Sequence, residues 1–250
     1  MATNGPALNL LIKAWSKPNF RPGQRNVLPG DEQVMKDVAT VDCRSWSKYC
    51  TGAPESPEAF HTCLMPMPWV GNLRTAKVFL LQLNPGFGAH DYFGEHRVRE
   101  YRAMLQANLR QAEGHAFPFL GPEHSWHGGA TYWAPRLRKI VDGLDGDWRR
   151  VAEGTAVLEL VPYHSEVFKL GQPKVNRLES VRLMRAFVRE ELVPAAKEGK
   201  CALITLRAHA RWEVSGLQKA RLARSARLDT GGVQRAISVL GSCDAHRDLS

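Results

Sequence analysis

The chain has 250 residues, of which 44% are hydrophobic and 24% charged, values typical of a globular protein with a substantial core. Its formal net charge of +9 favours a polyanionic partner, and we expect nucleic acid because no basic amphipathic membrane anchor stands out. No apolar run approaches the ~18 residues of a membrane span, and the N-terminus lacks a signal-peptide pattern, so we expect a cytoplasmic protein without membrane association.

Residues 1–65 are irregular and rich in proline, and we expect them to form an extension packed on the core, with short helices at 7–17 and 31–39. From residue 66 to 250, short apolar runs alternate with amphipathic stretches. The apolar runs predict strands at 78–83, 156–161, 201–206 and 235–240, and the stretches predict helices at 95–112, 132–144 and 176–197. This alternation predicts a single α/β domain, a three-layer α/β/α fold around a central, mainly parallel four-stranded sheet.

Each predicted strand runs into a polar loop. These loops contain residues 84–86, 163–165, 207–209 and 242–246. Because the carboxyl ends of parallel strands meet at one edge of a sheet, we expect the four loops to line one pocket. Asn84 is the first polar residue after the first strand, although Asn-Pro-Gly is also good turn chemistry and by itself indicates only a turn.

Several kinds of site are excluded by missing motifs. The chain has no GxGxxG and no GxxxxGK[ST], so dinucleotide and P-loop binding have no support, and without GxSxG a nucleophilic Ser165 is not expected. The five cysteines form no CxxC pair, which indicates free thiols in a reducing compartment. His124 and His127 lack an evident third ligand. We therefore expect neither a metal nor a cofactor, and a metal at the two histidines is the lesser alternative.

The positive charge is concentrated near the C-terminus. Residues 207–227 hold six cationic side chains and one acidic one, which is +5 of the total +9. Such clustering favours a surface that contacts phosphates, although a solvated helix face would have the same composition.

Three motifs in this order resemble the uracil-DNA glycosylase superfamily. They are Leu83-Asn84-Pro85-Gly86-Phe87, Pro162-Tyr163-His164-Ser165 and Leu206-Arg207-Ala208-His209-Ala210-Arg211-Trp212. The chain is most similar to a branch with an LNPGF loop and a PYHS loop, over roughly residues 65–250. The superfamily's His-Pro-Ser loop is absent, and only the segment from Ser242 to His246 occupies its place.

The resemblance implies roles for the residues of the first loop. Asn84 would hold the hydrolytic water below the sugar, orienting it without acting as a base. Gly86 stands where the uracil-specific branch has a bulky aromatic residue, so the pocket should accept pyrimidines substituted at C5. Tyr92 or Phe93 would stack on the extruded base.

The other two motifs and the basic segment supply the remaining candidates. Tyr163 and His164 would contact the base or its substituent, and His164 would stabilise charge on the leaving base. Phe87 and Ser242 are further candidates for substrate contact. The candidates for DNA contact are Arg207, His209, Arg211, Lys219, Arg221 and Arg224.

Together these features predict a monofunctional DNA glycosylase that excises a 5-substituted pyrimidine and leaves an abasic site. The substrate implied is glucosylated 5-hydroxymethylcytosine in phage DNA, which would make the protein an antiviral enzyme. No lysine lies in the motif loops, so lyase chemistry is not expected, and no obligate protein partner is evident. The alternatives are uracil or thymine-mismatch repair, and a non-catalytic nucleic-acid-binding protein of the same fold.

Overall fold

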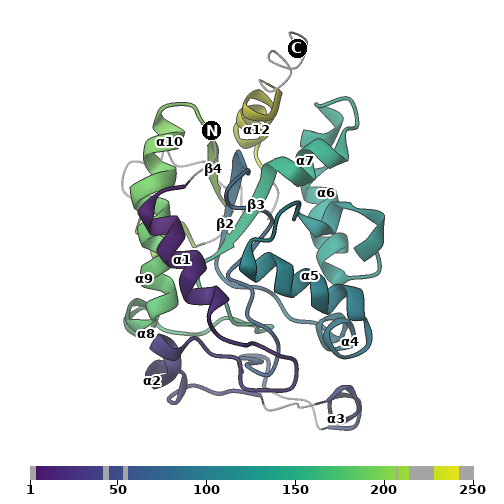
Figure 1. Ribbon diagram of the computed structural model, residues 1–250, viewed down its shortest axis with the longest axis vertical. Coiled ribbons are helices and arrows are strands. Elements are labelled where there is room, and N and C mark those ends of the chain that lie inside the picture. The colour runs from purple at the N-terminus through teal and green to yellow at the C-terminus, as the bar shows by residue number, and fades with distance from the viewer. Residues whose placement is uncertain (1–3, 42–44, 53–55, 207, 214–227, 242–250) are drawn as a thin grey trace.

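A computed structural model of the protein describes residues 4–41, 45–52, 56–206, 208–213 and 228–241 (Figure 1). Its centre is a four-stranded sheet with the order β1-β3-β2-β4. The strands are β1 (Trp69–Val70), β2 (Val78–Gln82), β3 (Thr155–Glu159) and β4 (Ala202–Thr205). The protein is therefore an α/β protein, as the sequence predicts.

The three apolar strands pair in parallel. Strand β2 pairs with β3 in the register Gln82↔Glu159 and with β4 in the register Leu81↔Thr205. Every residue of these three strands is buried, because helices cover the sheet: α9 and α10 lie on one side of it, and α6 and α7 on the other (Figure 1). A parallel sheet covered on both faces explains the nearly continuous apolar runs.

The prediction of a fourth parallel strand at 235–240 is wrong. These residues belong to a helix, α12 (Thr230–Gly241), which begins where the side chain of Asp229 accepts a hydrogen bond from the Gly232 amide at 2.6 Å. Val233, Ala236 and Leu240 form its buried face, a helical spacing that a short apolar run conceals. The fourth strand is β1, which pairs with β3 in the antiparallel direction, so the sheet is mixed.

Most predicted helices exist with different boundaries. The helix expected at 95–112 is divided at Val98, and the one expected at 176–197 is divided at Leu178 and passes through a π-helical turn. The helical segments before β3 are α1 (Pro6–Ser16), η1 (Pro29–Asp31), α2 (Glu32–Met35), α3 (Trp46–Thr51), α4 (Ala89–Arg97), α5 (Arg99–Arg110), η2 (Pro118–Leu120), η3 (Pro122–His124), α6 (Gly128–Asp142) and α7 (Trp148–Gly154). Those after it are α8 (Gln172–Arg177), α9 (Glu179–Phe187), η4 (Val188–Leu192), α10 (Val193–Lys197), α11 (His209–Trp212) and the C-terminal α12.

The N-terminal segment packs on the α/β core. Glu191 accepts hydrogen bonds from the amides of Gly5 and Leu8, which fixes the start of α1 against η4. The carboxylate of Asp31 accepts one from the amide of Ser180, so the same segment also satisfies the start of α9. Buried residues of α1 and of the sheet belong to one continuous hydrophobic core. In the described part of the chain no helix is long and apolar enough to span a membrane.

Candidate functional site

A cavity of about 240 Å³ lies beyond the carboxyl ends of β2 and β3. Its walls come from the loop after β2, the loop after β3, and the starts of α4 and α6. This is the position at which parallel α/β sheets bind ligands. Of the predicted site residues, the structure brings Asn84, Gly86, Phe87 and His164 together in this cavity.

The two loops that form the cavity are joined by hydrogen bonds. The Nδ2 of Asn84 donates to the carbonyl of Pro85 at 3.0 Å, to the Oγ of Ser165 at 3.0 Å and to the carbonyl of Tyr163 at 3.4 Å. These acceptors fix the orientation of the amide. If the amide were turned over, Oδ1 would face the two carbonyl oxygens, which cannot donate a hydrogen bond to it. Within the described residues no group donates to Oδ1, so this oxygen is free to accept a hydrogen bond from water.

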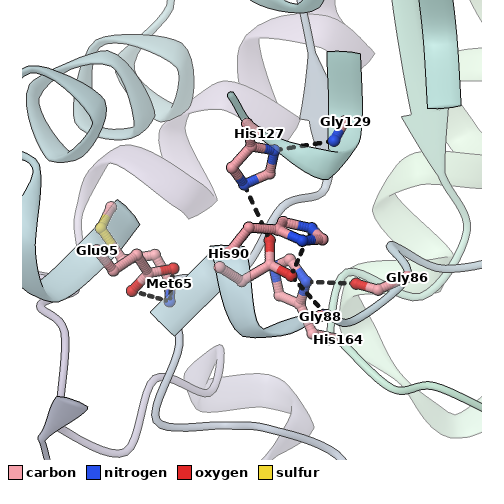
Figure 2. Close-up of polar contacts among 9 residues, drawn as sticks. Met65, Gly86, Gly88, His90, Glu95, His127, Gly129 and His164 are labelled. Carbon is pink, nitrogen blue, oxygen red and sulfur yellow. Dashed lines mark hydrogen bonds and ion pairs between the residues drawn. The ribbon is translucent and has the colours of Figure 1, made fainter. Parts of the chain in front are cut away.

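His164 is buried in the same wall. Its Nδ1 lies 2.8 Å from the carbonyl oxygen of Gly86 (Figure 2). Because a carbonyl oxygen only accepts, Nδ1 carries the hydrogen and Nε2 carries the lone pair. This Nε2 is buried, and no described residue bonds to it. It can accept a hydrogen bond from a ligand, or donate one when the ring is protonated.

Gly86 and Phe87 form the open side of the cavity. Gly86 is exposed, and a Cβ added to it would meet no atom within 4 Å, so neither packing nor backbone conformation requires glycine here. Phe87 lies flat on His61, with ring centroids 3.6 Å apart. Burial lowers the pKa of His61 to about 4, so this stacking partner is a neutral ring.

The opposite wall contains a buried carboxylate, Asp91, surrounded by histidines. Its Oδ2 accepts a hydrogen bond from the Gly88 amide at 2.8 Å and lies 3.3 Å from the Nε2 of His90, while its Oδ1 lies 3.3 Å from the Nε2 of His127 (Figure 2). Burial raises the pKa of Asp91, but the close contact with His127 and the charges of His164, His127 and His90 together outweigh burial and lower it. Asp91 is therefore an ionised carboxylate.

The spacing of His90, Asp91 and His127 is that of a possible metal site, since their ligand atoms all lie within 4.8 Å of one another. The tautomer of His127 argues against this use. Its Nδ1 accepts a hydrogen bond from the amide of Gly129 at 2.9 Å, so its Nε2 carries the hydrogen and points at Asp91. A histidine that binds a metal through Nε2 instead donates from Nδ1. We interpret the three residues as an electrostatic cluster in which both imidazoles lie at ion-pair distance from the carboxylate.

This interpretation predicts that metal ions do not stabilise the fold. Adding Zn²⁺ or EDTA should leave the melting temperature unchanged, because a ligand raises it only by binding the folded state. Thermal unfolding monitored by circular dichroism measures this directly. A rise with Zn²⁺ that disappears in His127→Gln would show that the cluster is a metal site.

The structure does not bring three of the predicted substrate-contacting aromatic side chains into the cavity. Tyr92 is fully buried, with its hydroxyl 2.8 Å from the Sγ of Cys63 and its ring stacked on Tyr49. Phe93 is exposed, with its ring edge-to-face with that of Trp126. Tyr163 points away from the cavity: its hydroxyl donates to the Oδ2 of Asp31 at 2.7 Å and accepts from the amide of Leu28 at 3.1 Å.

The position of Tyr163 predicts a role in stability. Tyr163→Phe should lower the free energy of unfolding by about 1–3 kcal/mol, because it leaves the buried amide of Leu28 without its acceptor. Urea unfolding measures this change. Unaltered stability would mean that the hydroxyl is not committed to Asp31 and is available to a ligand.

Most of the predicted DNA contacts cannot be placed. Arg207, Lys219, Arg221 and Arg224 lie outside the described residues, as does Ser242, the predicted substrate contact. His209 is half-buried at the start of α11. The guanidinium of Arg211 donates to the carbonyl of Leu170 at 2.9 Å and lies over the ring of Phe168. These contacts hold the Arg211 side chain against the loop after β3. A role of Arg211 in DNA binding stays a prediction.

Sequence reasoning missed the far wall of the cavity. Asp91, His90 and His127 line it, together with Gln82 and Glu159 from the last positions of β2 and β3. One signal was available: Gln82 and Glu159 are polar residues at the ends of otherwise apolar segments, and such residues are rarely buried unless they are paired. The adjacent His90 and Asp91, so close to the strand end, were a second signal.

No protein-family model, curated protein or solved structure matches the chain.

Proposed function

We propose that the protein is a monofunctional DNA glycosylase with a three-layer, uracil-DNA-glycosylase-like fold. The observation that carries the proposal is the fixed amide of Asn84 at the carboxyl end of β2, whose Nδ2 has three acceptors and whose Oδ1 is free. An oxygen oriented in this way can hold a water molecule beside the sugar of an extruded nucleotide. Positioning of this kind is what the hydrolysis of a glycosidic bond through an oxocarbenium-like transition state requires.

The size and lining of the cavity support a single extruded base as the ligand. Its volume of about 240 Å³ is small among ligand sites, which span roughly 300–1,000 Å³. Phe87 offers the ring on which the base would stack. The Nε2 of His164 would contact the base and stabilise negative charge on it as the bond breaks.

The open space at Gly86 supports a base with a substituent at C5. Gly86 lines the cavity, and no packing requirement explains the glycine. We propose glucosylated 5-hydroxymethylcytosine in phage DNA as the substrate and antiviral defence as the role. The net charge of +9 supports DNA as the partner.

A panel of modified DNAs tests this function. The purified protein is incubated with DNA that contains glucosylated 5-hydroxymethylcytosine, 5-hydroxymethylcytosine, uracil or a thymine mismatch, and abasic sites are then detected. We expect abasic sites in the glucosylated DNA. Cleavage restricted to uracil or mismatched DNA would replace the antiviral role with base-excision repair.

A further inference from the structure

His90 occupies a specific space in the cavity wall. Its ring lies where the side chains of two neighbouring residues would otherwise be: a Cβ on Gly128 would be 2.2 Å from its Cε1, and a Cβ on Gly88 would be 2.3 Å from the same atom. Both residues are glycines with ordinary backbone angles. The imidazole therefore fills the space that a Cβ would take, and a side chain at either position would require the ring to move.

The contact with Asp91 favours one tautomer of His90. The Nε2 of His90 lies 3.3 Å from the Oδ2 of the ionised Asp91, an ion-pair distance at which the carboxylate favours a hydrogen on Nε2 (Figure 2). The remaining nitrogen, Nδ1, therefore carries a lone pair. No described residue bonds to Nδ1, and the ring lines the cavity that also contains Asn84. A carboxylate that orients one imidazole nitrogen and leaves the other as a proton acceptor defines a general base.

We propose that His90 is the general base of the reaction and that Asp91 is its positioning residue. This inference rests on the proposed glycosylase function and adds to it the group that Asn84 cannot supply, because an amide orients water without accepting its proton.

The step follows from the chemistry of hydrolysis. The C1′–N bond breaks and its electron pair leaves with the base, while the oxygen of the water held by Asn84 bonds to C1′. One water proton passes to the Nδ1 of His90, and the hydroxyl remains on the sugar. Asp91 stabilises the imidazolium until its proton passes to solvent, and the departing base anion takes a proton in turn.

The surroundings of His90 predict the pH dependence. Three titratable groups face it among the described residues: Asp91 on α4, His127 at the start of α6 and His164 in the loop after β3. Burial lowers the pKa of His90, His127 and His164 lower it further, and Asp91 opposes them. The His90 imidazole must be neutral to accept a proton. Activity should therefore be maximal at pH 7 and fall as the pH drops through the lowered pKa of His90, which lies below the usual pKa of histidine.

Kinetics of two variants test the assignment. His90→Gln should reduce kcat by about 10²–10⁴-fold with little change in KM. Asp91→Asn should reduce kcat and also move the acid limb of the pH profile to lower pH, because the anion that raises the pKa of His90 is lost. His96→Gln, on the same helix but outside the cavity, serves as the matched control and should leave both unchanged. Near-wild-type rates in His90→Gln with an unmoved acid limb would overturn the proposal.

Gly128→Ala tests the position of the ring without altering His90. The added methyl group displaces the imidazole, so kcat should fall at least tenfold although alanine favours the helix. Gly171→Ala is the control, since its Cβ would meet only the Cδ of Pro173 at 3.8 Å. Full activity of Gly128→Ala would overturn the claim that this ring position matters.

A measurement that needs no turnover separates this inference from the proposed function. In ¹⁵N NMR of the wild-type protein at pH 7.5, with His90→Gln to assign the resonance, His90 should carry its hydrogen on Nε2. Asp91→Asn should lower its pKa. A hydrogen on Nδ1 would overturn the assignment even in an active glycosylase. If the wild-type protein releases no base from any DNA but His90 has the expected tautomer, the glycosylase function is overturned. The Asp91–His90 pair would then be the general base of a different hydrolytic reaction.

Discussion

Asn84→Ala should lower the rate of base release by about 10²–10³-fold or more, while the affinity for DNA changes little. In the proposed mechanism the side chain holds the reacting water, so its loss would remove an interaction that forms with the transition state and not with the DNA backbone. Its Nδ2 also links the loops after β2 and β3 through Ser165 and Tyr163. Single-turnover kinetics, with DNA binding measured by fluorescence anisotropy, separate the rate of the chemical step from affinity.

Asn176→Ala provides the matched control, because Asn176 is exposed on α8, outside the cavity. It should retain wild-type rates and affinity. If Asn84→Ala releases base at the wild-type rate, Asn84 is only a turn residue, as its sequence context alone would indicate.

Gly86→Tyr should change which base is excised. A tyrosine at this open position would occupy the space proposed for the C5 substituent, so excision of the glucosylated base should fall by at least about 10²-fold relative to uracil. The fold should tolerate the change, because a Cβ at Gly86 meets no atom within 4 Å. The ratio of kcat/KM for the two DNAs measures the effect, and the melting temperature checks the fold.

Gly86→Ala is the graded comparison and should have a smaller effect in the same direction, because a methyl group fills less of the space. Equal losses on both DNAs in Gly86→Tyr would contradict a steric role. An unchanged preference would mean that the substituent leaves the cavity by another path.

The sheet was largely predictable because its three long strands are fully buried. A strand covered on both faces must be apolar throughout, so 78–83, 156–161 and 201–206 are visible as continuous runs. Strand β1 has only two residues and gives no such signal. The run 235–240 misled because a short, mostly apolar segment fits a buried strand and one side of a helix equally well.

The candidate site was predictable where it lies in a loop that follows a strand. Asn84 and Gly86 lie in the loop after β2 and His164 in the loop after β3, and the parallel pairing of β2 with β3 brings the two loops to one edge of the sheet. The wall formed by α4 and α6 depends on helix packing, which brings together His90 and His127, 37 positions apart in the chain. Tyr163 was predicted at the site because it belongs to the motif that contains His164. Its side chain points away from the cavity instead, because its hydroxyl donates to Asp31, a residue that is distant in sequence.

The most direct test of the central claim is mass spectrometry of what the protein releases from DNA containing glucosylated 5-hydroxymethylcytosine. We predict the intact modified base, glucose included, and an unbroken strand with an abasic site, from the wild-type protein and not from Asn84→Ala. DNA that is bound but chemically unchanged would contradict this account and identify the protein as a nucleic-acid-binding module without catalysis.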